Sequence, residues 1–167
     1  MKNLYPRKEN ELNCLNSTVK LRPNVTIGLN CKIGDYTILG EVPKGNNSKD
    51  LETLIGDNAV IRSHTVIYAG NTIGRNFETG HQVMIREENK IGEFVSIGTG
   101  SIIEHHVKIN DNVRLHSNVF IPEYCILEKE CWIGPNVVLT NSRYPMSINS
   151  KENLKGVKIQ KKSKNRC

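Results

Sequence analysis

The fold is decided by IGEFVSIGTGSIIEHHVKINDNVRLHSNVFIPEYCILEKECWIGPNVVL, residues 91–139, in which isoleucine or leucine occupies every sixth position. The same register extends back to Ile55, and Thr79 is the one departure from it. An α-helix cannot keep a period of six on one face, and an ordinary strand alternates with a period of two. A sustained period of six is typical of short strands joined by turns into a solenoid. We therefore predict an all-β chain.

A second column, four residues after each aliphatic anchor, favours small or compact side chains. Its members are Ala59, Thr65, Val83, Val95, Ser101, Val107, Val113, Val119, Cys125, Cys131 and Val137. Both columns are expected to point into a narrow interior, where each fully buried aliphatic side chain contributes about 1.5–3 kcal/mol. The chain length suits one domain of about six coils with no second core.

The repeat is interrupted twice. Residues 1–20 are polar and aperiodic and are predicted to form a cap or arm. Residues 21–144 carry the coils, with a surface loop at 40–54 where Pro, Gly, Asn and charged residues break the register. Residues 145–167 are predicted to form a loop and a basic segment with one further hexad, anchored by Ile159, so that the solenoid ends short.

The net charge of +6 lies entirely in residues 151–167, which hold seven Lys or Arg against Glu152. Such a run is usually solvated, with binding to a phosphorylated small molecule or to nucleic acid as alternatives. No aromatic residue is interleaved with the basic ones, so we expect no nucleic-acid partner. The N-terminal residues form no hydrophobic run, so we expect neither a secretion signal nor a membrane span, and a cytoplasmic protein.

The cysteines lack metal-binding CxxC spacing; they are Cys14, Cys31, Cys125, Cys131 and Cys167. The second, third and fourth of these fall at compact inward positions, where a thiol acts as a small hydrophobe. We therefore expect a packing role in a reducing compartment, and no metal site.

One row of turns carries no formal charge. Because a coil takes eighteen residues, residues eighteen apart are expected to lie above one another. The turns after Ile61 and its equivalents then read Ser63-His64, His81-Gln82, Thr99-Gly100, Ser117-Asn118 and Pro135-Asn136. This neutral strip predicts either a partly buried cleft or a subunit contact. His116 has Gly98 and Gly134 as its neighbours in the column, so its imidazole is expected to have open space on both sides.

Four hexads carry a resemblance to a known family: IGDNAV (55–60), IGRNFE (73–78), IGEFVS (91–96) and IGPNVV (133–138). With them the chain resembles the hexapeptide-repeat acyltransferases, whose fold is a left-handed parallel β-helix. The segment ECWIGPNVVLTNSRYP (130–145) is similar to one in N-acetyltransferases that act on nucleotide-linked amino sugars. The resemblance implies acetyl transfer from acetyl-CoA to such a sugar, in surface-polysaccharide biosynthesis, by a homotrimer with its sites between subunits.

An amine that attacks a thioester needs positioning, a route for its proton and donors for the developing oxyanion. We predict His116 and Asn118 as catalytic residues. Residues of the neutral strip are predicted to bind the substrate: His81, Gln82, Ser117 and Asn136. The resemblance implies coenzyme contacts from Gly134 and Asn141, and phosphate contacts from Lys161 and Lys162.

Tyr144 bears on the acceptor group. Hydroxyl-acetylating relatives have a histidine before the proline that follows IGPNV, where this chain has Tyr144, and this favours N-acetylation.

Two other functions stay open. The chain could instead be a non-catalytic or truncated scaffold. A γ-class carbonic anhydrase would bind zinc through three histidines across subunits, but the spacing of the histidines does not reproduce that family's. His105 and His106 lie between acidic turns and are predicted to be solvated charge compensation.

Overall fold

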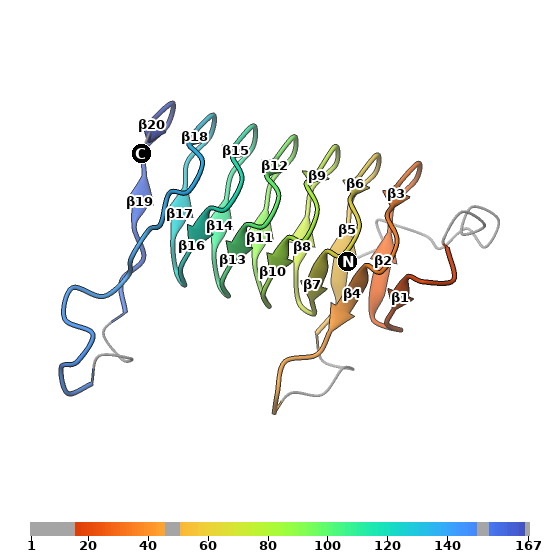
Figure 1. Cartoon of the computed structure of the whole chain (residues 1–167), viewed down its shortest axis with the longest axis horizontal. Helices are drawn as coiled ribbons and strands as arrows, with labels where there is room; N and C mark the ends of the chain where they lie inside the picture. Colours follow the sequence, from red (N-terminus) through yellow and green to blue (C-terminus); the bar gives the residue numbers. More distant parts are fainter. Residues whose placement is uncertain (1–15, 46–50, 150–153, 166–167) are drawn as a thin grey trace, which may run out of the picture.

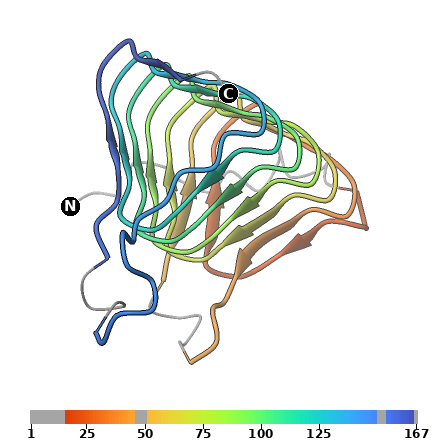
Figure 2. The same cartoon turned by 60° about the vertical axis from the view of Figure 1, so that its left-hand side comes forward.

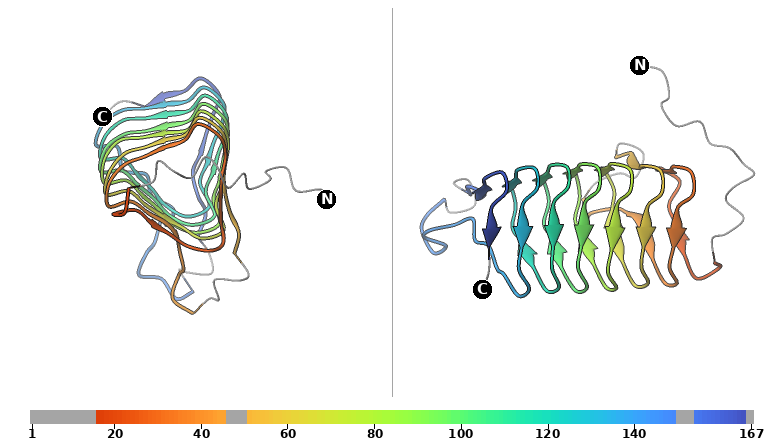
Figure 3. Two further views of the ribbon diagram at one scale, coloured as in Figure 1. Left: turned by 90° about the vertical axis from the view of Figure 1, so that its right-hand side faces the viewer. Right: turned by 90° about the horizontal axis from the view of Figure 1, so that it is seen from above.

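The structure is a computed structural model that describes residues 16–45, 51–149 and 154–165, and in these residues every regular element is a short strand. The strands form three parallel sheets that enclose a triangular prism (Figure 1 and Figure 3). Each strand pairs with the strand one coil later, with partners such as Met84 and Ile102 eighteen residues apart. The predicted all-β solenoid is confirmed.

Sheet A has six strands, and sheets B and C have seven each. Sheet A consists of β1 (Lys20–Leu21), β4 (Ile38–Glu41), β7 (Val66–Tyr68), β10 (Met84–Ile85), β13 (Ile102–Ile103) and β16 (Phe120–Ile121). Sheet B consists of β2 (Val25–Ile27), β5 (Thr53–Ile55), β8 (Thr72–Ile73), β11 (Lys90–Ile91), β14 (Lys108–Ile109), β17 (Ile126–Leu127) and β19 (Lys158–Ile159). Sheet C consists of β3 (Lys32–Ile33), β6 (Val60–Ile61), β9 (Glu78–Thr79), β12 (Ser96–Ile97), β15 (Arg114–Leu115), β18 (Trp132–Ile133) and β20 (Lys164–Asn165).

The core is the stack of anchors and compact residues that the hexads predict. The anchors from Ile55 to Ile133 are buried, Thr79 among them. The hydroxyl of Thr79 accepts a hydrogen bond from the backbone N–H of Arg62 at 3.0 Å, which explains how a polar side chain is accommodated at an anchor position. No helix in the described residues has the length and apolarity that crossing a bilayer requires.

Two buried asparagines were missed by the sequence pattern. Asn71 donates to the carbonyls of Tyr68 and Arg86, at 2.7 and 2.8 Å, and accepts from the backbone N–H of Asn89 at 3.0 Å. Asn89 repeats the arrangement one coil later, donating to the Arg86 carbonyl at 2.8 Å and accepting from the Val107 N–H at 2.7 Å. The amides therefore form a ladder beneath the turns that follow sheet A, with their hydrogen-bonding groups satisfied.

Both excursions leave the coil at the same corner, after sheet A, and Figure 2 shows them projecting on one side of the prism. The first lies between Glu41 and Thr53, narrower than the expected 40–54, because residues 53 and 54 pair with β2. The second follows residue 139, and the chain returns to the stack in β19 and β20, which pair with β17 and β18. Ile159 enters the core at 9% exposure. Most of the predicted N-terminal arm, residues 1–15, lies outside the described residues, as do Cys14 and Cys167.

Candidate functional site

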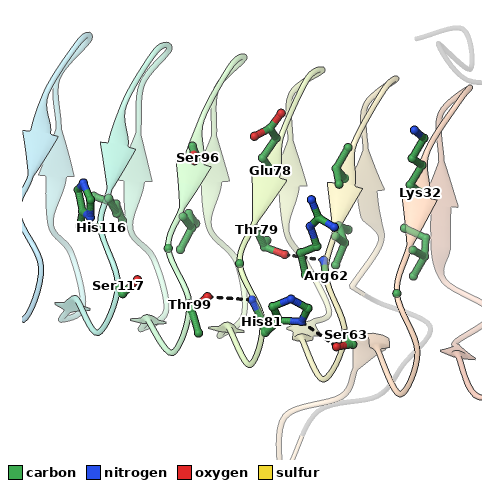
Figure 4. Close-up of a pocket in the computed structure, with 18 of the residues that line it drawn as sticks. Lys32, Arg62, Ser63, Glu78, Thr79, His81, Ser96, Thr99, His116 and Ser117 are labelled. Carbon is green, nitrogen blue, oxygen red and sulfur yellow. Dashed lines mark hydrogen bonds between the residues drawn. The ribbon is translucent and has the colours of Figure 1, made fainter.

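An open groove of about 790 Å³ runs along the outward face of sheet C and the turns that follow it (Figure 4). Its lining spans β3 to β15 and includes His81, His116 and Ser117. Gln82, Asn118 and Asn136 follow on the same row of turns, each at a φ of 57° or 58°. All six predicted catalytic and substrate-binding residues therefore lie along one edge.

His81 is held by the coils on either side of it. Its Nδ1 lies 2.8 Å from the hydroxyl oxygen of Ser63, and its backbone N–H donates to the Thr99 hydroxyl at 3.2 Å (Figure 4). Both partners are neutral, so the Ser63 hydroxyl orients the imidazole and the Thr99 hydroxyl holds the backbone of the turn without adding charge. Farther along the row, the amide of Asn118 donates to the amide oxygen of Asn136 at 3.3 Å.

His116 is packed more closely than the sequence predicted. Its ring meets the indole of Trp132 edge-on, with centroids 5.1 Å apart, so one side of the expected open space is filled. A Cβ added at Gly98 would lie 2.4 Å from the carbonyl carbon of His116. Gly98 therefore allows the next coil's backbone to approach, and does not serve to open space for the imidazole.

A second cluster occupies the opposite flank of sheet A, and we call it the acidic corner: Arg86, Glu87, Glu88, Glu104, His105, His106, Glu123 and Tyr124. Two nitrogens of Arg86 donate hydrogen bonds to the carboxylate of Glu87, at 2.8 and 2.9 Å, and a third lies 3.5 Å from Glu104. Burial opposes ionisation of Glu87, yet the pKa of its carboxyl lies below the ordinary value because the hydrogen bond from Arg86 and the surrounding positive charge outweigh burial.

The corner gives His105 a carboxylate partner. Its Nε2 lies 3.8 Å from one oxygen of Glu123, and the other oxygen of Glu123 accepts a hydrogen bond from Asn141 at 2.6 Å. Nδ1 of His105 lies 2.9 Å from Nδ1 of His106, whose Nε2 lies 3.2 Å from Glu88. The side chain of His105 is 27% exposed and contacts the ring of Tyr124, so it is less solvated than the sequence predicted. At 3.8 Å the Glu123 carboxylate is within ion-pair distance, so it can stabilise a protonated imidazole, the form that a general base takes after accepting a proton.

The residues predicted to bind the coenzyme lie on three different corners. Gly134 follows β18 on the groove edge, and Asn141 contacts the acidic corner. Lys161 and Lys162 lie after sheet B, 4.0 and 3.6 Å from Glu130. One copy of the chain therefore does not bring these four residues together.

The inward cysteines have the expected packing role. Cys125 and Cys131 are buried in the core, and Cys31 packs partly buried against it. Burial raises the pKa of all three thiols. Within the described ranges no group of three or more His, Cys, Asp and Glu side chains is arranged to hold a metal ion.

Comparison with known proteins agrees with this architecture. Residues 90–123 match the family described as bacterial transferase hexapeptide (six repeats). The structure is similar to that of LpxA, a UDP-N-acetylglucosamine acyltransferase from Bacteroides fragilis, with a TM-score of 0.63 and 17% identity over 76% of this chain and 67% of that one. None of the curated proteins matches the sequence.

Two further solved acyltransferases of UDP-N-acetylglucosamine superpose less well. The enzyme from Campylobacter jejuni gives a TM-score of 0.39 at 13% identity, over 75% of this chain and 61% of that one. The enzyme from Francisella novicida gives a TM-score of 0.25 at 21% identity, over 74% of this chain and 59% of that one. This chain thus spans about three fifths of the length of both. The chain is a left-handed parallel β-helix, and its residues 90–123 match the bacterial transferase hexapeptide repeats.

Proposed function

We propose that this chain transfers an acetyl group from acetyl-CoA to an amino group of a nucleotide-activated sugar, in surface-polysaccharide biosynthesis in the cytoplasm. The observation that carries the proposal is the pairing of His105 with Glu123 at the corner from which both loops emerge. The hexapeptide repeats support acyl transfer as the reaction class. The segment at 130–145 supports an amine as the acceptor.

The chemistry requires one base and no covalent intermediate. The amine lone pair attacks the thioester carbonyl, a C–N bond forms and the C–S bond breaks, and the thiolate leaves. The proton lost by the amine passes to the base and then to the thiolate. We assign this base to His105, because Glu123 lies beside Nε2 and can stabilise the imidazolium that forms. Nδ1 would accept the proton once its contact with His106 is released. His116, the base predicted from sequence, has no carboxylate within ion-pair distance in the described residues, and we assign it to substrate contact.

The groove supplies groups suited to a nucleotide-linked sugar. Lys32, Arg62 and Arg114 line it, and none of the three forms a salt bridge within the described part of the chain. They are available to a diphosphate, although Asp35 and Glu78 also line the groove. The hydroxyl and amide groups of Ser117, Gln82, Asn118 and Asn136 would face the sugar. Convergence of Gly134, Asn141, Lys161 and Lys162 on one coenzyme requires neighbouring copies. The proposal therefore includes a homotrimer with its sites between subunits, in which the acidic corner of one copy lies beside the groove of the next.

Calorimetry with acetyl-CoA, followed by a thiol-release assay on a panel of nucleotide-linked amino sugars, tests the function. We expect saturable coenzyme binding and release with at least one amino sugar but not with its hydroxyl analogue. Absence of both binding and release would favour the non-catalytic scaffold. Stoichiometric zinc in the purified protein together with CO₂ hydration would favour the carbonic anhydrase alternative.

A further inference from the structure

An exposed pair of aromatic rings lies at the end of the groove that the first coils form. The rings of Tyr36 and His64 have centroids 5.1 Å apart and planes tilted by 31°. Both residues are exposed, Tyr36 at 60%, and each directly follows a residue that lines the groove, Asp35 in one case and Ser63 in the other. The pair therefore offers a flat and accessible π-face next to the groove, on which a planar ring can stack.

The opposite end of the groove carries a second aromatic pair. His116 lines the groove there, and its ring meets that of the half-buried Trp132 at 5.1 Å. Strands β3, β6, β9, β12 and β15 are consecutive in sheet C, so four steps of about 4.8 Å, roughly 19 Å, separate the first coil from that of His116. The volume of about 790 Å³ lies in the usual range of small-molecule sites. This shape favours an elongated ligand with a ring at each end.

The groove beside the exposed pair carries a guanidinium without an ionic partner. Arg62 lies two residues before His64, is exposed, and forms no salt bridge with any residue that the structure describes. Figure 4 shows Arg62 nearer to the turns than Glu78, with Ser63 and His81 below it. The Ser63 hydroxyl lies 2.8 Å from Nδ1 of His81. A guanidinium with a hydroxyl and an imidazole nearby suits a phosphate group.

Asp35 lies in the same coil as Tyr36, one coil before Arg62. Its Oδ1 accepts hydrogen bonds from the side chains of Asn16 and Thr18, the second at 3.0 Å, and these hold the carboxylate at the end of the groove. A carboxylate repels phosphate but accepts hydrogen bonds from ribose hydroxyls, as acidic residues do in dinucleotide sites. The order aromatic pair, carboxylate and guanidinium is therefore the order base, ribose and phosphate.

We propose that the Tyr36–His64 pair is the base-stacking end of a nucleoside diphosphate site. The ribose lies at Asp35, the diphosphate at Arg62, and the attached sugar extends along the groove toward His116. This inference deepens the proposed function and rests on it for the sugar, whereas the nucleotide contacts stand without it. Because every base has a π-face, we expect the pair to accept both pyrimidine and purine nucleotides.

Calorimetry with UDP, ADP and inorganic pyrophosphate, in the absence of acetyl-CoA, tests the site. Tyr36→Ala should weaken binding of both nucleotides by about tenfold and leave the affinity for pyrophosphate unchanged. Tyr36→Phe keeps the ring and should bind as the wild type does, whereas Arg62→Ala should weaken binding of all three ligands. Phe94→Ala is the matched control and should change none of them. Phe94 is 50% exposed beside Arg75 in the turns after sheet B, but Arg75 is already paired with Glu93.

Three results would overturn the site: a wild type that binds neither nucleotide, a Tyr36→Ala variant with wild-type affinity for both, or a loss of pyrophosphate binding in Tyr36→Ala as large as the loss of UDP binding. Circular dichroism checks folding, and His64→Ala replaces Tyr36→Ala if that variant does not fold. Nucleotide binding that responds as expected in a protein without acyl transfer would keep the site and refute the proposed function. Acyl transfer in a protein whose nucleotide affinity ignores Tyr36→Ala would do the reverse.

Discussion

The two rows of turns that flank sheet A are the neutral strip and the acidic corner. They share one backbone conformation and differ in the chemistry of their side chains. His64, Gln82 and Asn118 on the neutral row have φ values of 57–61°, and His106 and Tyr124 on the acidic corner have 57° and 63°. On the neutral strip the histidines contact hydroxyl and aromatic groups, whereas at the acidic corner the histidines lie beside carboxylates. The repeat therefore fixes where side chains lie, and the contrast between columns carries the information about function.

The largest expected effect separates the two rows by their histidines. Because His105 has the carboxylate partner, His105→Ala should lower the acetyl-transfer rate by about 10²–10⁴-fold, the usual contribution of a general base. His116→Ala should lower the rate less and act mainly on the KM for the sugar. Steady-state kinetics of both variants checks this. A larger loss of kcat in His116→Ala would identify His116 as the base, as the sequence predicted.

The next effect concerns the support beneath the acidic corner. Asn89→Ala removes two buried hydrogen bonds and leaves the Val107 N–H without its partner, while the Arg86 carbonyl keeps the bond from Asn71, so it should destabilise the fold by about 2–3 kcal/mol. Asn110→Ala is the control, because its amide makes one hydrogen bond at a half-buried site, and it should cost about 1 kcal/mol. Urea unfolding measures both. Equal losses would show that the ladder is not a special support.

The ionic pair at the corner should be visible in the pH dependence of stability. The folded pKa of Glu87 is lowered, so the pair stabilises above the unfolded carboxyl value, about 4.3, and this contribution is lost as the pH falls through the folded value. Arg86→Met should therefore cost about 2 kcal/mol at pH 7 and less at low pH. Arg75→Met breaks an exposed pair with Glu93 and should cost at most about 1 kcal/mol. Unfolding curves that differ equally at pH 7 and pH 3 would contradict the assignment.

The smallest effect lies away from both rows. The double substitution of Glu for Lys161 and Lys162 should weaken acetyl-CoA binding by about tenfold if these side chains meet its phosphates, and it should reduce the salt dependence of binding. Lys90→Glu, on the outward row of sheet B, is the control. Calorimetry at two salt concentrations measures both variants. Unchanged affinity would show that the basic segment is only solvated.

Much of the fold could be predicted from sequence, because an anchor recurs at every sixth position from Ile55 onward and the anchors share one buried interior. The hand of the coil came from the family resemblance, since the period alone does not specify it. Buried Asn71 and Asn89 were missed because the pattern recorded side-chain size and not the backbone groups that need partners. The interpretation of Gly98 was wrong. A glycine can mark either open space beside a neighbouring side chain or the close approach of another backbone, and the sequence does not distinguish the two.

The groove edge was predicted from one row of turns, and the structure places those residues together. The proposed role of His105 at the acidic corner was missed from the sequence, although the spacing of eighteen residues predicts that His105 and Glu123 lie in one column. Charge alone made that column look solvated, and only the structure shows the half-buried imidazole beside its carboxylate.

The proposed site between copies is tested most directly by mixing two inactive variants. His105→Ala removes the proposed base at the corner, and Thr99→Arg fills the groove. If each site joins the corner of one copy to the groove of the next, co-assembly of equal amounts should restore about a quarter of the wild-type rate, because one junction in four is then intact on both sides. A mixture as inactive as its two parents, with mixed assemblies confirmed by mass, would contradict the account.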